Sequence, residues 1–155
     1  MKLLRLAPCC LALALLLAAL LTARGDEANG AWLTNYKQAL AAAQAGKKAV
    51  FADFTGSDWC GFCIKLKKEV LDTDDFKKLA ADKFVLLELD FPKKKAQSDE
   101  EKQQNAALAK QFKVRGYPTI LILDADGKEH GRIVGYAGKA DWMDQLKKIL
   151  AANGG

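Results

Sequence analysis

Three short and almost uninterrupted apolar segments constrain the fold of this chain most strongly. They run from Ala49 to Phe54, from Phe84 to Leu89 and from Thr119 to Leu123. Segments of this length without polar alternation are typical of strands covered on both faces, as in a parallel or mixed sheet between layers of helices. The pattern therefore predicts an α/β fold in which the strand at residues 49–54 lies centrally.

Helical periodicity fills the intervals between these strands. Apolar residues recur every three to four positions over residues 30–45, from residue 60 onward and near the end of the chain. They are Trp32, Tyr36, Leu40 and Ala43, then Leu66, Val70 and Leu71, and finally Trp142, Leu146, Ile149 and Leu150. Capping-type residues around Asp72 predict that the second helix is interrupted and restarts there.

A turn signal and a charged loop complete the expected order of elements. The Asp-Ala-Asp-Gly sequence at residues 124–127 predicts an antiparallel hairpin with a strand at residues 132–136. The charged residues 92–104 predict a loop that runs into a helix. The order is helix, strand, helix, strand, helix, strand, strand, helix, with about four strands and about four helices. A chain of 155 residues fits one such domain.

The first 25 residues have the layout of a secretory signal peptide. Lys2 and Arg5 precede a charge-free apolar run, and small residues before Asp26 allow cleavage there. The run is shorter than the roughly 20 residues of a membrane-spanning helix, so a permanent anchor is the weaker alternative. We expect residues 1–25 to be removed and residues 26–155 to form an exported, monomeric domain in the periplasm or cell envelope, with no stable membrane span.

The charge of the chain argues against nucleic-acid binding. The formal net charge is +5, and removal of Lys2, Arg5 and Arg24 with the signal peptide reduces it to about +2. The remaining basic and acidic residues are interspersed, without the basic stripe that a nucleic-acid surface needs.

The mature chain keeps two of the four cysteines, Cys60 and Cys63. Cys9 and Cys10 lie in the expected signal peptide, before its apolar run, an order that disfavours lipidation. A compartment that permits disulfides and a spacing of three residues indicate one small-loop disulfide. Zinc is a weaker alternative, because it needs three or four ligands and the mature chain adds only His130. A purely structural disulfide is the other alternative.

The position of Cys60 at the predicted start of a helix favours redox chemistry. Its sulfur would face unsatisfied backbone N–H groups and the positive end of the helix dipole, which favour thiolate over thiol. Because the thiolate is the form that attacks a disulfide, Cys60 is the expected nucleophile, and Cys63, one turn later, the resolving thiol.

Two motifs resemble the active-site segments of thioredoxins and protein disulfide isomerases. The first is Trp59-Cys60-Gly61-Phe62-Cys63, which follows an apolar strand, and the second is Val114-Arg115-Gly116-Tyr117-Pro118-Thr119. The resemblance covers residues 30–152. It implies a thioredoxin fold, a thiol–disulfide oxidoreductase without metal or cofactor, and partners that are thiol- or disulfide-containing proteins together with a redox partner protein.

The resemblance also implies roles for four further residues. Pro118 would be cis and lie beside Cys60, with the backbone of Tyr117 pairing with an extended substrate. Asp53 matches the buried acid that accepts a proton from the resolving cysteine, although one extra residue separates it from the first cysteine. Trp59 would shield the thiolate and contact substrate. The alternatives are a proline that merely starts a strand, a surface-facing Asp53 and a packing role for Trp59.

The redox direction depends on the residues between the cysteines. Oxidising relatives often carry a histidine there, which stabilises the reduced thiolate, and Phe62 cannot do this. We therefore expect a reductase or isomerase. Two other classes remain open: a copper chaperone that uses both thiolates and His130, and a redox-silent scaffold that grips extended peptides around Tyr117.

Overall fold

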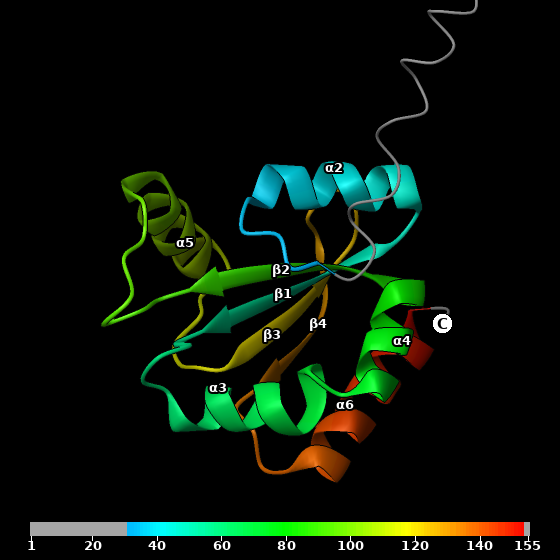
Figure 1. Ribbon diagram of the computed structural model, residues 1–155. Helices are drawn as coiled ribbons and strands as arrows, with labels where there is room; N and C mark the ends of the chain where they lie inside the picture. The colour runs from blue at the N-terminus through cyan, green and yellow to red at the C-terminus, as the bar shows by residue number, and fades with distance from the viewer. Residues whose placement is uncertain (1–30, 154–155) are drawn as a thin grey trace, which may run out of the picture.

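A four-stranded mixed sheet forms the centre of the computed structural model, which describes residues 31–153. The strand order is β2-β1-β3-β4 (Figure 1). β1 is parallel to β2 and antiparallel to β3, and β3 pairs antiparallel with β4. The strands are β1 (Ala49–Thr55), β2 (Phe84–Asp90), β3 (Thr119–Leu123) and β4 (Glu129–Val134). The predicted mixed sheet, its central first strand and its final hairpin are confirmed.

Helices cover both faces of the sheet, which explains the uninterrupted apolar strands. One core lies under α2 (Tyr36–Gly46) and α5 (Asp99–Gln111). The other lies under α3 (Gly61–Leu66), the π-helical turn η1 (Lys67–Leu71), α4 (Asp74–Lys83) and α6 (Lys139–Ala152), on the opposite side of the sheet in Figure 1. Successive residues of a strand point to opposite faces, so β1, β2 and β3 each contribute to both cores. β4 contributes Ile133 to the core under α3, α4 and α6.

The prediction that the first helix begins near residue 30 is wrong. The helix begins at Tyr36, and the Asn35 side chain caps it by accepting a hydrogen bond of 3.0 Å from the N–H of Gln38. The preceding segment is extended, and Leu33 forms a parallel bridge with Leu87 of β2. Trp32 thereby packs against the core on the other face, where its ring lies edge-on to that of Phe51. Its four-residue spacing from Tyr36 only imitates helical periodicity.

The predicted interruption near Asp72 is confirmed. The helix that starts with α3 ends through η1 at Leu71, and Thr73 caps α4 by accepting a hydrogen bond of 3.4 Å from the N–H of Phe76. Within residues 31–153, α4 is thus a fifth α-helix where about four were expected. The last strand lies earlier than the predicted residues 132–136, because Gly135 with φ of +78° follows its end.

The expected signal peptide, residues 1–25, lies outside the described residues. Within residues 31–153, no helix is long and apolar enough to cross a membrane.

Candidate active site

Cys60 and Cys63 form a disulfide at the start of α3. Cys60 is the N-cap residue, and its sulfur accepts a hydrogen bond of 3.2 Å from the N–H of Cys63. The Cα atoms of the two residues are 5.2 Å apart. Both side chains are buried, and Cys60 is the more exposed of the two. The predicted placement of both cysteines at a helix start is confirmed.

The turn before Cys60 is fixed by the charged loop that follows β2. The Asp58 carboxylate accepts hydrogen bonds of 2.7–3.0 Å from the backbone N–H groups of Lys93, Lys94 and Lys95, which lower its pKa. Ser57 donates through its N–H and its hydroxyl to the Asp90 carboxylate, at 2.8 and 2.6 Å. Sequence reasoning missed both carboxylates, because their partners are more than 30 residues away in the chain.

Trp59 joins this turn to the segment that carries the proline. Its indole N–H donates to the carbonyl oxygen of Phe91 at 2.8 Å, and its ring lies edge-on to that of Tyr117, with centroids 6.0 Å apart. The Lys93 ammonium lies 4.0 Å from the centroid of the Trp59 ring. The Trp59 side chain is 39% exposed, so one part of it packs against the protein and another part faces solvent. A Cβ atom at Gly56 would clash with this ring, at 2.6 Å, so the turn requires glycine there.

Pro118 follows a cis peptide bond after Tyr117, as the resemblance implied. The Tyr117 ring also packs against that of Phe91, with centroids 5.0 Å apart. The segment is held just beyond the end of β4 by the N–H of Gly135, which donates to the Pro118 carbonyl oxygen at 2.8 Å. The loop after β2, the cysteine turn and the proline segment therefore meet at one end of the sheet.

Asp53 is buried in β1, so the surface-facing alternative is wrong. Within residues 31–153 its Oδ1 atom has no hydrogen-bond partner. Burial raises its pKa to about 8; Glu88 and Asp90 add to this shift and Lys67 opposes it. Asp53 and Cys63 line the same hollow, of about 180 Å³. The raised pKa of Asp53 keeps this carboxyl mostly protonated at pH 7.

Glu88 is a second carboxyl in this hollow, and sequence reasoning missed it. It lies opposite Asp53 in the parallel register of β1 and β2. Burial and the nearby Asp90 raise its pKa. The signal in the sequence was an acidic residue inside an apolar strand, as at Asp53.

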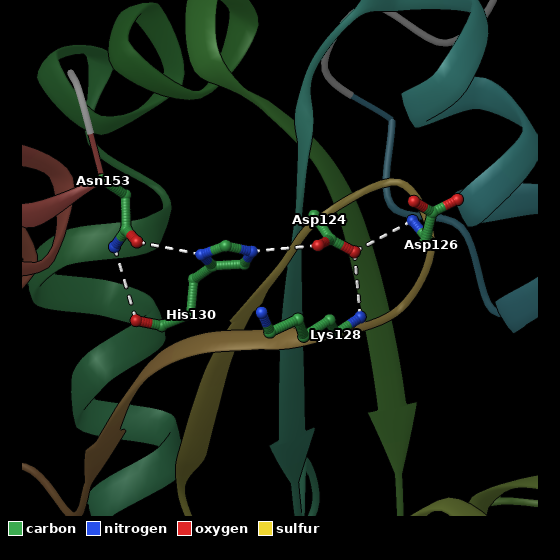
Figure 2. Close-up of polar contacts among 5 residues, drawn as sticks. All are labelled: Asp124, Asp126, Lys128, His130 and Asn153. Carbon is green, nitrogen blue, oxygen red and sulfur yellow. Dashed lines mark hydrogen bonds and ion pairs between the residues drawn. The ribbon is translucent and has the colours of Figure 1, made fainter.

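His130 lies at the other end of the sheet and takes no part in this site. Figure 2 shows its ring between the Asp124 carboxylate and the Asn153 side chain, with a distance of 2.9 Å on each side. The copper site that the alternative of a copper chaperone needs, from His130 and the two cysteines, is therefore not assembled. No group of three or more His, Cys, Asp or Glu residues that could hold a metal ion occurs in the described part of the chain.

Comparison with known proteins matches this geometry. The profile of the family described as "Thioredoxin-like domain" matches residues 36–150. The chain is 37% identical over 125 residues to the disulfide bond reductase DsbH of Chlamydia pneumoniae, which covers 79% of this chain and 74% of that protein. A solved structure of a DsbH oxidoreductase has a TM-score of 0.71 and 31% identity, and it covers 97% of this chain and 94% of its own.

A second curated relative is longer than this chain. The thioredoxin-related protein DsbJ of Chlamydia pneumoniae is 34% identical over 108 residues, which are 70% of this chain but 31% of DsbJ. The kinship and the Cys60–Cys63 disulfide lead to one conclusion. The chain belongs to the thioredoxin-like domain family and is a DsbH-like thiol–disulfide oxidoreductase.

Proposed function

We propose that this protein reduces disulfides in other proteins, with Cys60 as nucleophile and Cys63 as resolving thiol. The observation that carries the proposal is the position of the Cys60 sulfur at the helix N-cap, facing the N–H of Cys63. Donors aimed at this sulfur favour its ionised form, which is the attacking species. Cys63 is the less exposed of the two and lies on the side of Asp53.

The reaction has two exchange steps. The Cys60 thiolate attacks one sulfur of the substrate disulfide, that bond breaks, and the other substrate sulfur leaves as a thiolate. Cys63 then loses its proton and attacks the Cys60 sulfur of the mixed disulfide, which releases the second substrate thiolate. Two electrons have passed from the dithiol to the substrate, and the Cys60–Cys63 disulfide remains.

Asp53 is the proposed acceptor of the Cys63 proton. It shares a hollow with Cys63, and its raised pKa of about 8 lies close to that of an ordinary thiol. A proton moves readily between groups whose pKa values are close.

Trp59, Tyr117 and Pro118 are the proposed substrate-binding residues. Trp59 is partly exposed next to the disulfide, and the neighbouring Phe62 and Ile64 are 61% and 47% exposed. Apolar side chains that remain in water around a reactive site offer contact area to a protein substrate. The backbone before Pro118 is the proposed partner of an extended substrate segment.

Export is part of the proposal. The apolar run after Lys2 and Arg5 supports removal of residues 1–25 and action in the cell envelope by the mature domain, residues 26–155. A redox partner protein that returns electrons to Cys60–Cys63 follows from the reductase role. N-terminal sequencing of protein from fractionated cells tests the cleavage and the location.

The decisive experiment measures insulin reduction and the reduction potential of the same protein. We expect turnover with dithiothreitol as reductant and a potential, from equilibration with glutathione, on the reducing side of the glutathione pool. Cys63→Ser is the matched variant, because it should accumulate a mixed disulfide at Cys60. A strongly oxidising potential, or equal insulin reduction by wild type and Cys60→Ser, contradicts the proposal.

A further inference from the structure

The hollow beside Cys63 contains two carboxyl groups rather than one. Asp53 and Glu88 are register partners in parallel strands, so their side chains leave the same face of the sheet. Both line the hollow together with Cys63. Asp53 is buried, whereas Glu88 is only half-buried. One carboxyl thus lies inside and the other lies nearer the solvent.

The hollow is large enough to let a proton pass between these groups. Its volume of about 180 Å³ exceeds several times what one water molecule needs, and the polar side chains among its lining residues offer such water hydrogen-bond partners. Trp32 from the extended segment before α2 also lines the hollow. Water can therefore connect the Cys63 thiol, the inner carboxyl and the outer one.

The charges around the hollow favour one shared proton. From the helical side, Lys67, Lys68 and Asp72 line it, and the Lys67 ammonium pairs with Asp72 at 3.1 Å. Asp90 at the end of β2 adds negative charge that acts on both carboxyls. Two carboxylates on neighbouring strands, one of them buried, would repel each other, so the pair favours holding one proton at neutral pH. Asp53 is the carboxyl that holds this proton, because its burial disfavours the charged form. Glu88 is only half-buried and stays in contact with solvent.

We propose that Glu88 completes a proton relay with Asp53 during the resolving step. The proton of the Cys63 thiol moves to Asp53 while the proton already on Asp53 moves to the Glu88 carboxylate. The products are a Cys63 thiolate, a protonated Asp53 and a protonated Glu88, which then loses its proton to solvent. Glu88 acts through Asp53 and is in this sense a positioning residue. The inference rests on the proposed role of Asp53.

A single-turnover experiment tests the relay. Reduced protein is mixed with oxidised glutathione and quenched with acid, and mass spectrometry separates the mixed disulfide from the internal disulfide. For Glu88→Gln we expect mixed-disulfide formation within about twofold of wild type. Conversion to the internal disulfide should be about tenfold slower at pH 6.5. This is less than the roughly 100-fold of a direct general acid or base, because Glu88 acts through Asp53. This deficit should disappear above pH 8, where Asp53 ionises and accepts the proton without a relay.

Two further variants separate the relay from a structural effect. Glu88→Asp retains the carboxyl and should restore most of the lost rate. Glu100→Gln removes an exposed carboxylate on α5 and should behave as wild type. Glu88→Gln in an Asp53→Asn background should add little, because both residues serve one path.

The outcomes distinguish the relay from the proposed function. The relay is overturned if Glu88→Gln converts the mixed disulfide to the internal disulfide at the wild-type rate at pH 6.5. It is also overturned if this conversion is slowed by the same factor at every pH. If Asp53→Asn resolves slowly and Glu88→Gln does not, Asp53 keeps its proposed role and Glu88 has none in the resolving step. A wild-type protein that forms no glutathione adduct at Cys60 removes the proposed function itself.

Discussion

The two ends of the sheet place an aspartate in opposite surroundings. At the redox end Asp53 is buried, its Oδ1 has no partner within residues 31–153, and its pKa is raised to about 8. At the other end Asp124 lies near the surface and accepts hydrogen bonds from the His130 ring and from the N–H groups of Asp126 and Lys128, each 2.9 Å long (Figure 2). These bonds lower its pKa.

The difference shows that partners, rather than residue type, decide what a carboxyl can do. Asp124 stays ionised and holds His130, whose ring also contacts Asn153 after α6. The Asn153 amide donates to the carbonyl oxygens of Ile149 and His130, so its own oxygen faces the ring and both ring nitrogens face acceptors. At that end of the sheet, the charged Asp124 carboxylate holds the His130 ring in place. The redox end instead keeps an uncharged acid available for proton transfer.

The largest expected contrast between the two ends is in activity. Cys60→Ser should lower insulin reduction by about 1000-fold or more, because the remaining Cys63 thiol is less exposed and has no second thiol beside it to release the substrate. His130→Gln should stay within about twofold of wild type, since His130 lies at the far end of the sheet. Turbidity of reduced insulin measures both. A large loss of activity in His130→Gln would break the comparison.

The second contrast concerns stability and pH in the oxidised protein. Asp53 remains protonated in the folded state up to about pH 8, whereas the unfolded chain ionises near pH 4. Unfolding therefore releases a proton in this window, and stability should fall as pH rises from 4 to 8. Asp53→Asn should remove this fall and increase the free energy of unfolding at pH 8 by roughly 2 to 4 kcal/mol.

Asp124→Asn is the matched variant for this contrast and should have the opposite sign. Because the pKa of Asp124 is lower in the folded than in the unfolded state, its carboxylate stabilises the fold at pH values above the ordinary pKa. This stabilisation is lost as the pH falls through the pKa of the folded state. The variant should be less stable than wild type at neutral pH. Guanidinium unfolding at pH 5 and pH 8 measures both variants, and a shift of the same sign in both contradicts the comparison.

A smaller effect is expected at the exposed apolar rim of the redox end. Phe62→Ala should raise KM for protein substrates by about threefold to tenfold, because Phe62 is 61% exposed and available to substrate. Its rate with oxidised glutathione, which is too small to cover this rim, should not change. Equal losses with both substrates would place the defect at the cysteines instead.

The smallest expected effect is the pH response of His130. The bonds to Asp124 and Asn153 raise its pKa, so its contribution to stability is complete below the ordinary value of about 6.5 and is lost as pH rises through the higher folded value. His130→Gln should lower the melting temperature slightly at pH 6 and less at pH 9. A nuclear magnetic resonance titration of the ring checks the direction, and a midpoint below 6.5 contradicts it.

Local pattern alone predicted most of the secondary structure. The strand at residues 119–123 has the predicted bounds, the break near Asp72 occurs where capping residues stand, and Cys60 begins a helix as expected. The resemblance added the cis bond before Pro118. The cis bond apart, these features depend on neighbours a few residues apart, whose spacing is visible in the chain.

Tertiary structure decided which distant residues meet. Glu88 became the neighbour of Asp53 only through the register of β1 and β2, and Asp58 found its three donors in a loop 35 to 37 residues away. Trp32 lies in an extended segment and not in the predicted helix, because the neighbouring Leu33 pairs with β2. Such contacts between distant residues are determined jointly by strand pairing and by burial. The sequence by itself therefore determined the fold class and the redox pair, and packing determined the surroundings that set the charge of Asp53.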